Sequence, residues 1–88
     1  MDLTLGQVVI SKAGRDAGKK FVVTGIIDTS YVYLSDGSLR KVEKPKKKKI
    51  KHIQLTEIVL QDLGMKLRTN QKVSNSEIRK ALANIEVV

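Results

Sequence analysis

Positively charged side chains are the residues of this chain best suited to chemistry, and they gather in two groups. Of the 17 lysines and arginines, 12 lie among the first 55 residues, beside only five aspartates and glutamates. The first group surrounds a stretch bracketed by two glycines and comprises Lys12, Arg15, Lys19 and Lys20. The second group follows an Asp-Gly pair and comprises Arg40, Lys41, Lys44, Lys46, Lys47, Lys48, Lys49, Lys51 and the adjoining His52. Cations concentrated in one segment favour a polyanionic partner, of which nucleic acid is the usual one.

The cationic residue types predict two kinds of contact. A guanidinium can grip a phosphate or a guanine edge with two hydrogen bonds, so we expect oriented contacts from Arg15 and Arg40. The lysines are expected to follow the backbone as point charges. Each neutralised phosphate releases counterions, so binding should depend steeply on salt. Asp16, within the first group, is expected to cap its loop or to orient Arg15.

Aromatic residues are few, so the chain has little surface on which unpaired bases could stack. The chain has one phenylalanine and two tyrosines, Phe21, Tyr31 and Tyr33. We expect Phe21 in the core, and Tyr31 and Tyr33 on one strand face, with burial favoured over exposure for stacking. Proteins that read unpaired bases usually present more aromatic surface. The composition therefore favours recognition of folded RNA through shape and phosphate.

Residues suited to catalysis or metal binding are scarce. The chain has one histidine, His52, and no cysteine. A general base needs a positioned partner, and the sequence around His52 supplies none. The carboxylates near the cations, at Asp16, Asp28, Asp36 and Glu43, are explained by turns and local ion pairing. We expect no catalytic residue, no metal, no cofactor and no enzymatic activity.

The concentration of positive charge admits three other interpretations. The lysines and arginines could serve solubility, but that role does not require their concentration in one segment. An enzyme is the least favoured. The main alternative is a protein-interaction adaptor of the transcription or translation machinery, with non-specific affinity for nucleic acid.

The first group of cations requires two strands and a tight loop between them. Apolar residues with a period of two predict strands over residues 6–12 and 19–28. Gly14 and Gly18 are expected where the backbone reverses sharply, because glycine tolerates positive φ. Gly25 lies inside the second strand and predicts a bulge or bend.

The second group requires a hairpin and an extended segment. A short strand over residues 31–34 precedes Asp36-Gly37, a strong hairpin signal, and residues 39–42 are expected to form the return strand. Residues 43–51 carry too many like charges for a packed strand, so we expect an extended, mobile basic loop. Residues 52–55 alternate again and predict a last strand. Short strands at close spacing predict a small five-stranded barrel.

The remainder of the chain is predicted to form two helices. One helix is expected from residue 57 to Arg68, with Thr56 as its N-cap, and another over Asn75–Ala83, opened by a capping box of Ser74 and Glu77. We therefore divide the single domain into a barrel, residues 1–56, and a helical extension, residues 57–88. The extension either covers one mouth of the barrel or binds a protein. Burial or exposure of its apolar residues decides between these, namely Leu60, Leu63, Leu67, Ile78 and Leu82.

Residues 6–9, 13–19 and 21–23 together resemble a KOW motif, the β-loop-β element of ribosomal proteins and of transcription factors of the NusG type. Residues 31–55, with Asp-Gly, Arg-Lys and then Pro-Lys-Lys-Lys-Lys, are similar to the archaeal and eukaryotic large-subunit ribosomal protein family fourteen-e and its small bacterial relatives. The similarity covers about residues 5–56. It implies an SH3-like barrel that lies on large-subunit ribosomal RNA. The implied RNA contacts are Gly14, Arg15, Gly18, Lys19, Arg40, Lys41 and the segment Pro45–Lys51.

Further expectations follow for partners and location. The helical extension is open to contact with ribosomal proteins, and a monomer is favoured. No apolar run approaches the roughly 18 residues of a membrane-spanning helix, and the start of the chain has no basic leader. We expect a cytoplasmic protein with no membrane partner.

Overall fold

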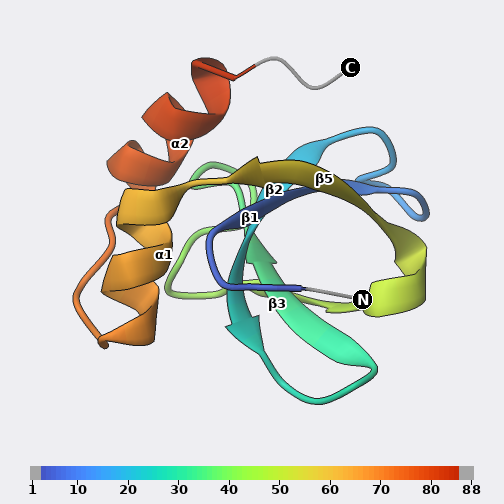
Figure 1. Cartoon of the computed structure of the whole chain (residues 1–88). Coiled ribbons are helices and arrows are strands. Elements are labelled where there is room, and N and C mark those ends of the chain that lie inside the picture. The colour runs from blue at the N-terminus through green and yellow to red at the C-terminus, as the bar shows by residue number, and fades with distance from the viewer. Residues whose placement is uncertain (1–2, 86–88) are drawn as a thin grey trace.

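A computed structural model describes residues 3–85, which form a strongly curved antiparallel sheet of five strands followed by two α-helices (Figure 1). The strands are β1 (Gln7–Ser11), β2 (Lys20–Ile26), β3 (Tyr31–Ser35), β4 (Lys46–Lys49) and β5 (Ile53–Val59). The helices are the 3-10 turn η1 (Ile50–His52), α1 (Gln61–Arg68) and α2 (Asn75–Ala83). A mainly β, barrel-like fold with two short helices was predicted and is confirmed. The outer ends of the expected barrel and extension, residues 1–2 and 86–88, lie outside the described residues.

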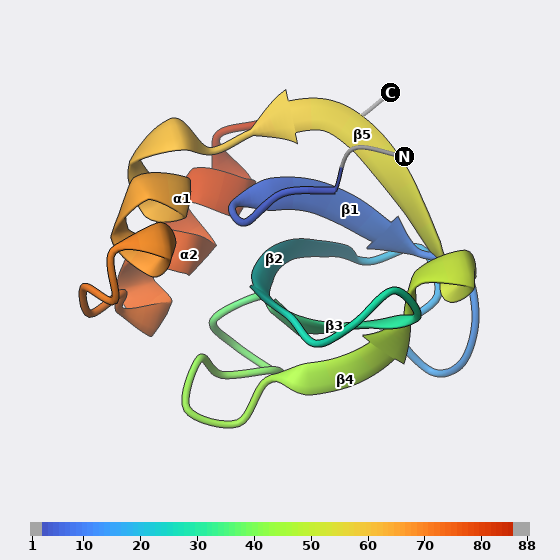
Figure 2. The same ribbon diagram turned by 60° about the horizontal axis from the view of Figure 1, so that its bottom comes forward.

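The strand order is β4-β3-β2-β1-β5, so β4 and β5 form the two edges. Figure 2 shows the strands from β5 to β4, with η1 joining the edge strands at one end and the helices standing across the other. The turn at η1 carries the chain from one edge to the other, which rolls the sheet. The register shifts between Val23 and Gly25, and this confirms the irregularity predicted at Gly25.

The sheet buries both of its faces because its strands carry apolar residues at consecutive positions. Val9 lies opposite Phe21, and both belong to the core enclosed by the curved sheet. Val8 lies opposite Val22, and both belong to a second core that the helices complete. Val8 and Val9 thus lie on opposite faces of the sheet, and so do Phe21 and Val22.

The helices complete the second core with Leu63, Ile78 and Leu82, which are all less than 8% exposed. Leu60 and Leu67 are partly buried against the same cluster. The apolar stripe of the extension thus packs on the sheet, against Val8 and Val22.

A close backbone contact fixes α1 against the start of β1. A Cβ added to Gly64 would lie 2.7 Å from the Leu5 carbonyl oxygen, and one added to Gly6 would lie 2.8 Å from the Gly64 Cα. Side chains do not fit at either position. Close packing against Leu5 and Gly6 therefore accounts for the glycine at position 64, although glycine weakens a helix.

The predicted return strand over residues 39–42 is wrong, because the partner of β3 is β4 (Lys46–Lys49), within the segment expected as an unpaired loop. Within residues 36–42, three backbone amides donate instead to side chains. The Asp36 carboxylate accepts from the Ser38 and Arg40 amides at 2.9 and 2.8 Å, and the Asn75 side chain accepts from the Val42 amide at 2.8 Å. Successive lysines in a strand point to opposite faces, which relieves the repulsion expected of a lysine run.

The predicted N-terminus of the first helix is also wrong. Strand β5 continues to Val59, and α1 begins at Gln61 after the N-cap position Leu60. Thr56 is not a cap, since its hydroxyl donates to the Val8 carbonyl at 2.6 Å. Helix α2 has the predicted bounds, and its capping box is formed by Ser74 and Glu77.

Candidate nucleic-acid interface

The turn between β1 and β2, residues 12–19, is called the first loop. Its ends are tied by hydrogen bonds from the Gly18 amide to the Ser11 carbonyl (2.8 Å) and from the Ser11 amide to the Lys19 carbonyl (3.0 Å). The predicted positive φ values are confirmed, at 79° for Gly14 and 85° for Gly18. A rigid turn thus displays three exposed cations, Lys12, Arg15 and Lys19.

The loop carboxylate is used differently from the prediction. Asp16 does not orient Arg15 but accepts from Arg40, whose Nη2 and Nε lie 3.0 and 3.2 Å from the Asp16 Oδ2. Asp16 is only 6% exposed. The bond joins the first loop to the segment between β3 and β4, residues 36–45, here called the second loop.

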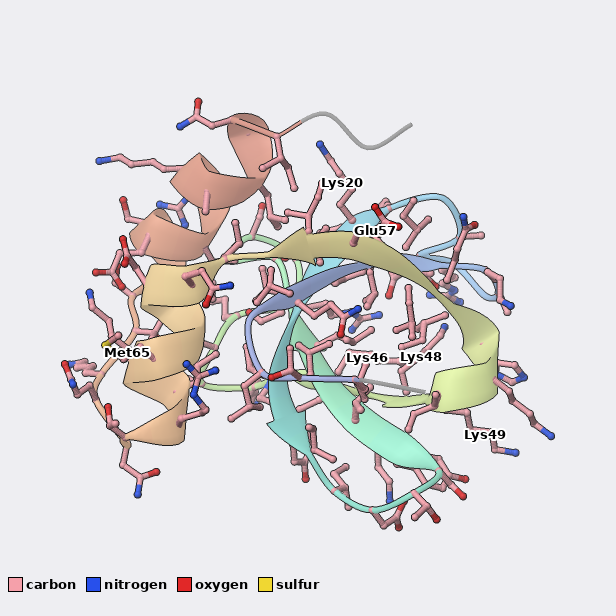
Figure 3. All side chains as sticks on the ribbon, viewed as in Figure 1. Lys20, Lys46, Lys48, Lys49, Glu57 and Met65 are labelled. Atoms are coloured by element: carbon pink, nitrogen blue, oxygen red, sulfur yellow. The ribbon has the colours of Figure 1, made fainter. Side chains whose placement is uncertain are left out.

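The lysine run of β4 is divided between the two faces of the sheet. Lys46 and Lys48 pair with Leu34 and Val32, whose side chains lie in the enclosed core. They are half-buried, and Figure 3 places them within the curve of the sheet. Lys47 and Lys49 are exposed on the other face, and Figure 3 shows Lys49 projecting outward.

Three of the predicted cations have partners within the protein. Lys48 Nζ donates to the Ala13 carbonyl at 2.8 Å, which is a second link between the two groups of cations. Lys20 Nζ donates to the Leu82 carbonyl at 3.2 Å, close to the end of α2, where the helix dipole favours a cation. Arg40 is held by Asp16. These residues support the arrangement of the loops and helices.

The other predicted cations face solvent to a greater degree. Within residues 3–85, the following exposed residues have no ion pair and no side-chain hydrogen bond: Lys12, Arg15, Lys19, Lys41, Lys44, Lys47, Lys49 and Lys51. His52 is half-buried in η1, and its carbonyl accepts from the Lys12 amide at 2.8 Å. The exposed cations are those able to meet phosphates without first breaking a bond.

Helix α2 holds the second loop in place, which the sequence did not indicate. Arg79 donates to the Gly37 carbonyl at 2.6 Å. The Asn75 side-chain amide, through its Nδ2, donates to both carboxylate oxygens of Glu43 at 3.0 Å. This interaction is the largest cause that lowers the pKa of Glu43. A Cβ at Gly37 would fall on the Asn75 carbonyl oxygen. The second loop is thereby presented as a fixed surface.

A groove of about 650 Å³ lies beside η1. Its lining consists of Lys12, Thr29, Ser30, Tyr31, Lys49, Ile50, Lys51 and Ile53. Three predicted cations therefore converge here with hydroxyl and apolar side chains. Thr29 and Ser30 were not predicted as site residues. Their only signal was a hydroxyl-rich turn next to a β-type run.

Other kinds of site are not indicated by the part of the chain that the structure describes. Residues 3–85 contain no group of three or more histidine, aspartate or glutamate side chains placed to hold a metal ion. None of the described helices has the length and hydrophobicity needed to cross a membrane.

Comparison with known proteins identifies relatives along nearly the whole chain. No protein-family model matches the sequence. The large ribosomal subunit protein eL14 of Pyrobaculum calidifontis is 30% identical over 80 residues, which are 91% of this chain and 71% of that protein. The eL14 protein of Staphylothermus marinus is 27% identical over 82 residues, 93% of this chain and 78% of that protein. Matches of this length include most of the helical extension, beyond the residues 5–56 that carry the sequence resemblance.

Proposed function

The chain belongs to the family of large ribosomal subunit proteins eL14, and on that premise we propose that it binds structured ribosomal RNA of the large subunit through backbone phosphates. The first loop and the exposed cations of the second loop, β4 and η1 form the contact surface. The observation that carries this proposal is the pair of links, Asp16–Arg40 and Lys48–Ala13, that holds the two groups of cations next to each other.

The geometry suits phosphate better than base edges. Exposed lysines on short strands and turns act as point charges that accept many phosphate positions. Arg15, at the exposed first loop, is the arginine available for an oriented contact, because Arg40 is committed to Asp16. Each phosphate neutralised by such a cation adds affinity and makes binding more salt-dependent.

The helical extension supports this function indirectly. Its apolar stripe is buried on the sheet, so the exposed stripe that would have favoured a protein-interaction adaptor is not available among residues 3–85. We propose that residues 1–56 and 57–88 fold as one unit, since Val8 and Val22 share a core with Leu63, Ile78 and Leu82. We expect contacts with ribosomal proteins on the outer surfaces of α1 and α2.

The role is that of a structural component without enzymatic activity, in keeping with the name of its relatives. The site of action is the cytoplasmic ribosome.

Sedimentation of the tagged protein from cell lysate through a sucrose gradient tests the function. We expect the protein to travel with large subunits at low and at high salt, because a specific docking site survives screening better than scattered charge contacts. A matched pair of variants sharpens the test. Arg15→Ala/Lys19→Ala should release the protein at lower salt. Arg68→Ala/Lys80→Ala, which removes the same charge from the helices, should have a smaller effect, because only the loop cations are proposed to meet RNA phosphates. Recovery of wild-type protein only at the top of both gradients contradicts the proposal.

A further inference from the structure

We infer that the groove beside η1 holds one unpaired nucleotide of the bound RNA. This inference rests on the proposed function and adds the kind of RNA element that is recognised. The groove lies between the turn at residues 28–30, the end of β1 and η1. Its volume of about 650 Å³ falls within the range of about 300–1,000 Å³ that is usual for sites of small organic groups.

The groove is framed by backbone hydrogen bonds. The Ile50 amide donates to the Ser30 carbonyl at 2.8 Å, and the Lys12 amide donates to the His52 carbonyl at 2.8 Å. The Asp28 carboxylate accepts from the amides of Ser30 and Tyr31 at 2.7 and 2.8 Å. These bonds join three separate segments, so the walls are preformed and binding does not have to order them.

The charge of the groove suits a phosphate. Lys12 comes from the first loop and Lys49 and Lys51 from the junction of β4 and η1, and none of the three is paired with a carboxylate within residues 3–85. Outside the lining, Lys47 Nζ lies 4.6 Å from the centre of the Tyr31 ring. An exposed cation–π contact is worth only about 0.5–1 kcal/mol, so Lys47 is free to turn toward a phosphate.

The rest of the lining suits a sugar and a base. Ile53 is 5% exposed, while Ile50 and the Tyr31 ring are half-buried in the wall. Thr29 and Ser30 bring hydroxyl groups that make no side-chain hydrogen bond among the described residues. Aspartate and glutamate side chains of an acidic peptide could satisfy the ammonium groups, but these side chains bring no flat ring for the aromatic wall, whereas a nucleotide carries its negative charge and its ring in one unit. A base inside a duplex already has both faces stacked, so the groove accepts only a nucleotide that is bulged or unpaired.

Binding of two RNA hairpins tests the inference. The hairpins have the same stem, one carrying a single bulged 2-aminopurine nucleotide and the other fully paired. Stacking of one base on an aromatic side chain predicts about 5-fold or more tighter binding of the bulged hairpin, with quenching of the 2-aminopurine fluorescence. Tyr31→Leu should abolish this preference and leave binding of the paired hairpin unchanged. Tyr31→Phe should keep it, and so should Tyr33→Leu, which changes an exposed tyrosine outside the groove.

A second readout needs no variant. On addition of the bulged hairpin to wild-type protein, the amide resonances of Thr29, Ser30 and Ile50 should shift more than on addition of the paired one. Equal affinities for the two hairpins, equal shifts, or displacement of the bulged hairpin by hexaglutamate as effectively as by unlabelled RNA would each overturn the inference. Association with large subunits in the gradient would then still hold, whereas loss of that association as well would overturn the proposed function too.

Discussion

Asp16 and Arg40 are 24 positions apart in the sequence and form an ion pair between the first and second loops, with Arg40 Nη2 3.0 Å from the Asp16 Oδ2. The Asp16 side chain is 8% exposed and the Arg40 side chain 33%. The carboxylate is therefore largely desolvated and depends on this partner. The pair turns two separate loops into one supported surface.

Asp16→Asn is expected to lower the free energy of unfolding by about 1–2 kcal/mol, because the hydrogen bonds of a charged acceptor contribute more than those of a neutral one. Urea denaturation measures this. Asp62→Asn, at an exposed position of α1, should stay within about 0.5 kcal/mol of wild type. Equal stabilities of the two variants would show that the pair contributes nothing to the fold.

Gly64→Ala is expected to destabilise the protein by about 1–3 kcal/mol through overpacking, although alanine favours a helix by about 1 kcal/mol. The added Cβ would lie 2.7 Å from the Leu5 carbonyl oxygen, which belongs to the backbone and cannot turn aside. Thermal unfolding gives the comparison. Gln61→Ala, at the exposed start of the same helix, is the control, and a more stable Gly64→Ala protein would contradict the close contact.

Local patterns predicted the parts of the fold in which sequence neighbours act together. Alternation of apolar residues predicted the two strands that carry Val8, Val9, Phe21 and Val22. Capping chemistry predicted the start of α2 at Ser74. Strand β4 escaped prediction because its pairing with β3 depends on Asn75 and Asp36, which occupy the backbone of the segment that would otherwise pair.

The sequence predicted which cations belong to the candidate site but not how they are arranged in space. The two groups of cations were found from charge alone, but their internal partners come from distant segments. Lys20 reaches a carbonyl of α2, and Lys48 reaches Ala13. No local pattern signals such contacts, so the division of the lysines into supporting and exposed ones required the structure.

The capping box of α2 gives a pH dependence. The pKa of the Glu77 carboxyl is lowered from its ordinary value of 4.5, first by its bond with the Lys66 ammonium at 2.7 Å and then by the Ser74 amide. The carboxylate form is favoured in the folded state. Its contribution to stability is therefore complete above the unfolded pKa and is lost as the pH falls through the folded value.

Glu77→Gln should accordingly be less stable than wild type at neutral pH, and the difference should shrink as the pH falls below 4.5. Urea midpoints measured across that range test this. Glu43, whose pKa is also lowered by its bond with Asn75, titrates in both proteins, so the comparison isolates Glu77. Glu57→Gln, at an exposed position of β5, should show no such trend. A difference that is constant down to pH 3 would contradict the lowered pKa.

The division of the β4 lysines between two faces predicts unequal effects on RNA binding. Lys47→Ala/Lys49→Ala removes two exposed cations and should lower the slope of log affinity against log salt by about 1.5, without loss of stability. Lys46→Ala/Lys48→Ala removes the same charge from the half-buried positions. That variant should change the slope by less than half as much. It should also lower the free energy of unfolding by about 0.5–1.5 kcal/mol, since the bond from Lys48 to the Ala13 carbonyl is lost.

Filter binding of a large-subunit RNA fragment at four salt concentrations, with thermal unfolding of each variant, separates the effect on RNA binding from the effect on stability. Identical slopes for the two double variants would mean that RNA reaches both faces of β4 equally, contrary to their different exposure.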